Sequence, residues 1–161
     1  MVLNVVGVLA SLAIALGSVA FSHYIAQKIK FRSNFGGLVT ELNYNLKVLA
    51  DIRELLRLDE EAEKGGKLVA TTFPRLSRFA FNYFVIEGHL PKLPEEVRKK
   101  LLEIYRAFDM INWYLDHYNE TKYGVLFVTT GAGEIRRRIR EAIKLLISQA
   151  EQAIRDFLKP L

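Results

Sequence analysis

Histidines at metal-ligand spacing are the first feature to test for chemistry. Helical metal sites often place Glu three residues before His, so that both side chains share one face. The residues three positions before His23, His89 and His117 are Ala20, Ile86 and Tyr114, none of them acidic. The chain has no cysteine, which excludes thiolate ligands, disulfides and a cysteine nucleophile. No nucleophile-elbow motif surrounds any serine. We therefore expect no metal, no cofactor and no catalytic residue.

A glycine-containing segment offers a second kind of chemistry, phosphate binding. β-prone residues 125–128 are followed by Thr-Thr-Gly-Ala-Gly and then by a predicted helix, which is the order found around phosphates at helix N-termini. The Gly-Lys-Ser/Thr ending of a P-loop is missing, and Glu134 would repel a phosphate. We interpret the segment as a loop that caps the last helix.

Four arginines within five residues form a basic cluster. Arg136, Arg140 and Lys144 share one helical face, whereas Arg137 can pair with Glu141 one turn later. We favour a solvated face. Contact of Arg136 and Arg140 with anionic lipid headgroups is the alternative. Nucleic acid is not expected as a partner, because no groove-reading motif accompanies the cluster.

Three polar side chains lie close to predicted apolar helix faces. Glu41 and Asn45 are one turn apart beside Leu42, and Asn112 follows Ile111. A buried Asn can specify the register of packed helices. The same residues could instead line a ligand pocket between helices, which would make the protein an enzyme or a small-ligand binder.

The N-terminal segment is apolar and free of charged side chains. Residues 2–21 are uncharged, and twenty helical residues rise about 30 Å, the thickness of the hydrocarbon core of a bilayer. The cations Lys28, Lys30 and Arg32 follow the segment rather than precede it, unlike a signal peptide. The positive-inside rule then predicts a single-pass membrane protein with its main domain in the cytoplasm, and the three cations near anionic lipid.

Small residues recur on one face of this segment at spacings of three and four. They are Gly7, Ser11, Ala15, Ser18 and Ser22. Such a stripe lets two helices approach closely in lipid, which predicts self-association of the anchor. The alternative is a soluble homo-oligomer that buries its apolar helices at the subunit interface.

Four amphipathic stretches predict the architecture of the remaining chain. Their apolar residues repeat every three or four positions, most clearly from Val97 to Leu115. The stretches cover residues 37–58, 72–87, 94–120 and 134–158. Residues 59–67 and 88–93 are predicted connections, and residues 121–133 give no clear pattern. We predict an all-α protein: an N-terminal transmembrane-like helix in residues 1–30 and an antiparallel four-helix bundle in residues 31–161.

A resemblance supports this layout. Beside the apolar N-terminus, the chain contains Glu41-Leu42-x-x-Asn45-Leu46, Gly88-His89-Leu90-Pro91 with Leu93-Pro94-Glu95, Tyr105 and Asn112. In these features it resembles uncharacterised small membrane-anchored helical proteins of bacteria and archaea. The resemblance implies the architecture and carries no activity.

The functional expectation is a non-enzymatic, membrane-tethered bundle that self-associates or docks a protein partner. Phe81, Phe84, Trp113 and Tyr114 are the candidate contact residues, because their helices have more apolar surface than one seam needs. Few Gln, no Cys and abundant Glu, Lys and Arg suggest a thermophilic source.

Overall fold

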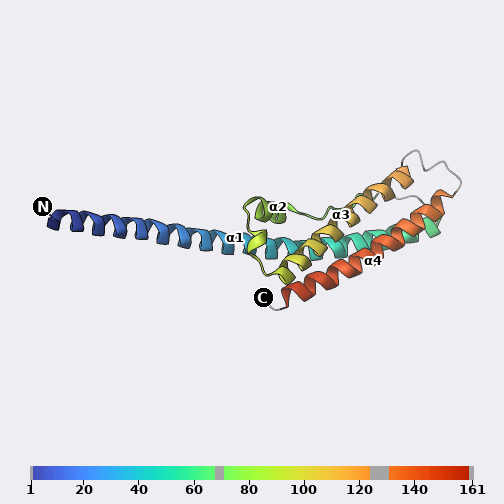
Figure 1. The fold of residues 1–161 in the computed structure, drawn as a ribbon. Helices are drawn as coiled ribbons and strands as arrows, with labels where there is room; N and C mark the ends of the chain where they lie inside the picture. Colours follow the sequence, from blue (N-terminus) through green and yellow to red (C-terminus); the bar gives the residue numbers. More distant parts are fainter. Residues whose placement is uncertain (1, 68–70, 124–130, 160–161) are drawn as a thin grey trace. The chain divides into compact units, whose positions relative to one another are not determined.

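The computed structural model is all-helical over the residues that it describes, which confirms the predicted fold class. It describes residues 2–67, 71–123 and 131–159, without the side chains of residues 2–10 and 12. The elements are α1 (Val2–Lys64), α2 (Phe79–Ile86), the 3-10 helix η1 (Leu90–Lys92), α3 (Glu95–Tyr123) and α4 (Ala132–Leu158) (Figure 1). The chain forms two compact units, Met1–Gly37 and Leu38–Leu161.

The first unit is the N-terminal part of α1. Its described apolar side chains are exposed, with Ile14 at 73%, Val19 at 66% and Phe21 at 66%. Within the described residues, no helix has a stretch both long and apolar enough for a membrane span. The transmembrane character predicted for residues 1–30 is thus not supported by the structure. The unit ends at Gly37 rather than at residue 30.

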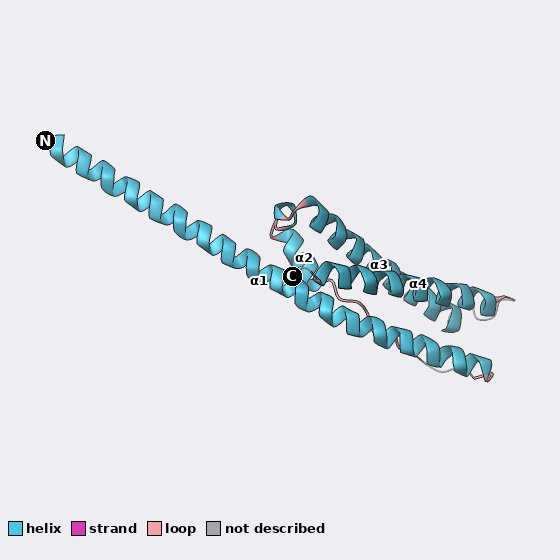
Figure 2. Ribbon diagram, turned by 90° about the horizontal axis from the view of Figure 1, so that it is seen from below, coloured by secondary structure: helices cyan, strands magenta, loops and turns pink. Residues whose placement is uncertain are grey.

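The second unit is a bundle built from the C-terminal part of α1, from α3 and from α4, with the short α2 beside them. α3 and α4 pack side by side (Figure 2). The core consists of side chains at the predicted steps of three and four, because a helix turns once in 3.6 residues. The fully buried apolar side chains include Leu38, Leu42, Leu49, Ile52, Leu56, Leu101, Ile104, Phe108, Ile111, Ile143, Ile147 and Ile154.

The first helix of the bundle is longer than predicted. α1 continues without a break from the first unit and runs to Lys64, through residues expected to form a loop. Asp59 is buried, and Glu60 and Glu63 pair with residues of α4. These contacts between helices hold the acidic residues in helical conformation. Only the turn at Gly65 and Gly66, where Gly66 has a φ of 70°, ends the helix.

The second predicted helix is mostly not helical. Residues 71–78 are extended, and α2 contains only the eight residues Phe79–Ile86. Its buried side chains are Phe81 and Phe84, whereas Phe79 and Ile86, predicted for the core, are exposed. The predicted face was wrong because Leu76, which set it, belongs to the extended segment. Phe81 and Phe84 are therefore not surface contact residues.

The predicted glycine cap after α2 is confirmed. Gly88 has a φ of 65°, a conformation that favours glycine. Its N–H bonds to the carbonyl of Val85, and the N–H of His89 bonds to that of Phe84, the pattern of a Schellman motif. Of the unassigned residues 121–133, the first three end α3 and residues 124–130 lie outside the described residues. The phosphate-like segment falls largely among the latter.

Phe108→Ala tests the core, because Phe108 is fully buried on α3. We expect the free energy of unfolding to fall by about 3–5 kcal/mol, from lost burial and the cavity left behind. Urea titration in mild detergent, followed by circular dichroism, measures it. Leu145→Ala, at a side chain 60% exposed on α4, is the control and should change stability by less than about 0.5 kcal/mol. Equal effects would contradict the described core.

Candidate functional site

A buried carboxylate lies between α1, α2 and α3. Glu41 is 7% exposed and accepts four hydrogen bonds. Two come from hydroxyls, Ser77 Oγ at 2.9 Å and Tyr105 Oη at 2.7 Å. Two come from backbone N–H groups at the start of α2, Ala80 at 2.7 Å and Phe81 at 3.3 Å. Glu41 thus caps α2 from another helix, satisfying donors that lack partners within α2.

Two asparagines bind the backbone of the extended segment from opposite sides. Asn45 on α1 donates to the carbonyl of Ser77 at 2.8 Å and accepts from its N–H at 2.8 Å. Asn112 on α3 donates to the carbonyl of Leu76 at 3.2 Å and accepts from its N–H at 3.1 Å. The side-chain amides therefore replace the hydrogen bonds that a helix would supply at these two residues.

The predicted ligand residues thus converge together with a tyrosine, but they converge on the chain's own segment. Phe81 stacks on the Tyr105 ring at 4.0 Å, and burial together with the bond to Glu41 raises the pKa of Tyr105. An open groove of about 380 Å³ lies nearby. Its lining residues are Arg78, Phe81, Leu102, Glu103, Tyr105, Arg106 and Asp109. Glu41, Asn45 and Asn112 do not belong to that lining.

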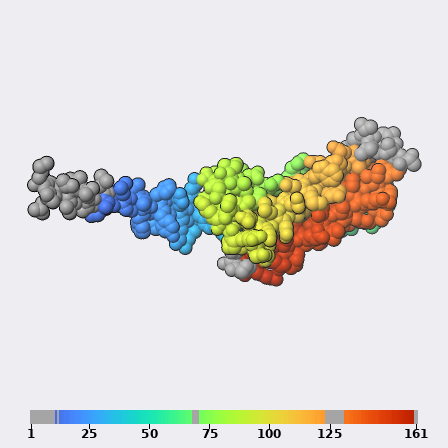
Figure 3. Space-filling model, in the orientation of Figure 1, coloured from blue at the N-terminus to red at the C-terminus, as the bar shows by residue number. Residues whose placement is uncertain are grey.

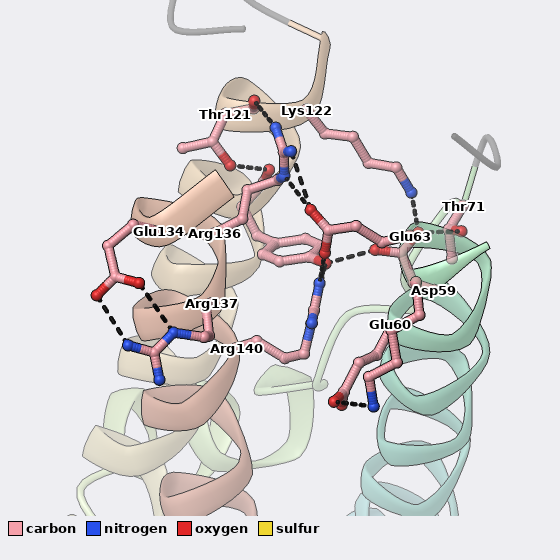
Figure 4. A network of polar contacts seen from close by, with 12 residues as sticks. Asp59, Glu60, Glu63, Thr71, Thr121, Lys122, Glu134, Arg136, Arg137 and Arg140 are labelled. Atoms are coloured by element: carbon pink, nitrogen blue, oxygen red, sulfur yellow. Dashed lines mark hydrogen bonds and ion pairs between the residues drawn. The ribbon is translucent and has the colours of Figure 1, made fainter. Parts of the chain in front are cut away.

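A second polar cluster joins the helix ends near the C-terminus of α1 (Figure 4). Asp59 accepts hydrogen bonds from Tyr118 and Lys122 of α3, and all three are at most 5% exposed. Arg140 of α4 donates to Tyr118 Oη at 2.9 Å. Burial, followed by the hydrogen bond to Asp59, raises the pKa of Tyr118. The phenol therefore stays protonated and bridges the carboxylate of α1 to the guanidinium of α4.

Glu63 carries the remaining ion pairs of this cluster. It accepts from Arg140 and from Arg136, the latter at 2.9 Å. Burial alone would raise the pKa of Glu63, but the bonds from Arg140 and then Arg136 outweigh it and lower the pKa. Arg136 also donates to the carbonyl of Thr121 at 3.2 Å. These contacts tie α1, α3 and α4 together.

The basic cluster therefore does not form one solvated face. Arg140 is 5% exposed, and the side chain of Arg136 is 12% exposed. Arg137 remains on the surface and makes the predicted pair with Glu141, at 3.1 Å. Since Arg136 and Arg140 are occupied by Glu63, we do not propose them further as lipid contacts. Lys28, Lys30 and Arg32 are exposed side chains of the first unit.

The predicted association residues lie on two elements. Ser11, Ala15, Ser18 and Ser22 are exposed on α1, and Gly7 lies outside the residues whose side chains are described. Trp113 is 53% exposed on α3 and packs against His117, with ring centroids 3.8 Å apart. Tyr114 is half-buried and meets Trp113 edge to face at 4.9 Å.

Sequence reasoning missed the second cluster, although a signal for it exists. Asp59 and Glu63 continue the steps of three and four that Ile52 and Leu56 begin. Tyr118 and Lys122 continue the α3 seam beyond Leu115 in the same way. Following each seam past its last apolar residue would have revealed that the helices end on complementary charges.

Comparisons with known proteins give no further assignment. No protein-family model, curated protein or solved structure matches the chain. Within the described residues, no group of three or more His, Cys, Asp or Glu side chains could hold a metal ion.

Asn45→Ala tests the clamp on the extended segment. The change leaves the N–H and carbonyl of Ser77 without their partner, so we expect the free energy of unfolding to fall by about 2–4 kcal/mol. Asn43→Ala is the matched control: Asn43 is exposed and bonds only within α1, to the carbonyl of Val39. Its cost should be below about 1 kcal/mol by urea titration. An Asn45→Ala protein as stable as that control would refute the clamp.

Acid should weaken the second cluster. The pKa of Glu63 is lower in the folded protein than its ordinary value of 4.5, so the folded state favours the ionised form. The resulting stability is fully present above pH 4.5 and is lost as the pH falls through the lowered pKa. Urea midpoints between pH 7 and pH 3 measure this loss. Glu63→Gln should reduce the pH dependence, whereas Glu103→Gln, at an exposed residue of α3, should retain it. An unchanged slope in Glu63→Gln would argue against the ion pairs.

Proposed function

We propose that the chain is a non-enzymatic helical bundle, tethered to a membrane by its N-terminal segment, with its main domain in the cytoplasm. The observation that carries the proposal is the combination of an uncharged segment, residues 2–21, with cations only behind it. The proposal rests on that full segment, of which part lies outside the described side chains. Exposed Ile14, Leu16 and Phe21 support it, since such side chains seek an apolar environment.

The convergence of Glu41, Asn45 and Asn112 on the chain's own backbone supports a structural role for these residues. Their hydrogen bonds go to Leu76, Ser77 and the start of α2, as described above. A ligand at this position would have to displace the extended segment, together with the buried Phe73 and Leu76. We therefore favour a scaffold or docking protein over an enzyme with a pocket inside the bundle.

The contact face of this scaffold lies on α3. Met110, Trp113, Tyr114 and His117 are spaced by three and four residues and so share one stripe. Met110 is 42% and Trp113 is 53% exposed, and large aromatic side chains of this kind dominate protein interfaces. We propose that copies of the chain associate through this stripe, aided by the small residues on α1.

Two measurements on the full chain test the proposal separately. Membrane fractionation should place the protein in the pellet, and extraction should require detergent. Recovery in the supernatant without detergent would refute the tether. In mild detergent, light scattering should give an oligomer, and Trp113→Ser should lower the mass to that of one chain. Leu145→Ser, equally exposed on α4, is the control and should leave the oligomer intact. An unchanged mass in Trp113→Ser would refute the α3 contact.

A further inference from the structure

α2 has two faces, and both are apolar. Its sequence, Phe-Ala-Phe-Asn-Tyr-Phe-Val-Ile, contains no charged residue. Phe81 and Phe84 face the bundle and are buried. On the opposite face, Phe79 is 82%, Tyr83 is 44% and Ile86 is 81% exposed. These three residues are spaced by four and three positions, so they form one continuous stripe, which we call the α2 stripe.

The α2 stripe is fixed in its outward position by the rest of the unit. The N–H groups of Ala80 and Phe81 bond to Glu41, and the Schellman motif at Gly88 holds the other end. The Phe81 ring stacks on Tyr105. α2 cannot turn its stripe inward without losing these contacts. In Figure 3, the yellow-green part of the chain that includes α2 lies at the surface of this unit.

The size of the stripe decides what can cover it. An aromatic side chain buries about 150–250 Å² at most, so three half-exposed or exposed side chains offer on the order of 400 Å². A stable protein interface buries about 800 Å² on each partner. The α2 stripe alone is too small for that. A bilayer surface demands no complementary shape, and aromatic rings such as Phe79 and Tyr83 are enriched where hydrocarbon meets water.

We propose that the α2 stripe contacts the surface of a phospholipid bilayer, with Phe79, Tyr83 and Ile86 entering the interfacial region. This inference rests on the proposed N-terminal tether. A tethered domain meets the bilayer at a high effective concentration, so a contact too weak to recruit a free protein suffices. The stripe then acts as a second membrane attachment, which orients the bundle.

The contact places a requirement on the connection between tether and bundle. Residues 22–37 span about 25 Å if helical, and α2 is held at Glu41 just beyond them. The stripe reaches the bilayer only if this connection tilts or bends. Gly36 and Gly37, at the boundary of the two units, are the residues with the lowest helix propensity there.

Quenching by lipids tests the inference on the full chain in phosphatidylcholine vesicles. Trp113→Phe removes the single tryptophan, and Phe79→Trp then places a reporter in the stripe. Bromine on the acyl chains should quench this reporter at least twofold, with a blue-shifted emission. A Leu145→Trp reporter on α4, also exposed, is the control and should be quenched by less than a fifth. Ile86→Trp provides a second stripe reporter if Phe79→Trp does not fold, as judged by circular dichroism.

The outcomes separate this inference from the proposed function. A protein that fails to float with the vesicles refutes the tether itself. A protein that floats, with stripe reporters quenched no more than the control, refutes only the α2 contact. A blue-shifted reporter that bromolipid does not quench, and whose shift disappears at one chain per vesicle, would also refute it and assign the stripe to a second copy.

Discussion

The position of α2 depends on one buried carboxylate, that of Glu41. Its four hydrogen bonds join α1, the extended segment, the start of α2 and Tyr105 of α3. An unpaired buried carboxylate is very costly, so the groups that satisfy Glu41 are constrained to stay together. The constraint explains why residues 71–78 do not become helical despite their apolar spacing. It also leaves Phe79 and Ile86 outside the core.

The second polar cluster plays the corresponding role at the other end of the unit. Each long helix keeps its seam apolar over several turns and then places charged residues at the next seam positions: Asp59 on α1, Lys122 on α3 and Arg140 on α4. Buried ion pairs add little net stability, because desolvation offsets their attraction. They do penalise every register in which a charge would lose its partner. Polar contacts at both ends thus specify how the apolar seams align.

Much of the fold could be predicted from the sequence, because the seams of α3 and α4 depend only on helical periodicity. The failures share one physical cause. Whether Asp59 lies in a loop or a helix, and whether Leu76 is extended or helical, is decided by partners distant in sequence, Lys122 and Asn112. Local pattern contains no information on such pairs. Glu41, Asn45 and Asn112 were recognised as unusual from their places beside the seams. That their partner is the chain's own backbone could be learned only from the fold.

Amide hydrogen exchange at Leu76, Ser77 and Ala80 in the full-length protein tests most directly the claim that these polar residues hold the chain's own segment. The account predicts that the three amides, each bonded to a side chain, exchange as slowly as core amides of α3 such as that of Phe108. Exchange at the rate of an exposed loop would contradict it. The segment would then be open, and Glu41, Asn45 and Asn112 would be free to bind something else.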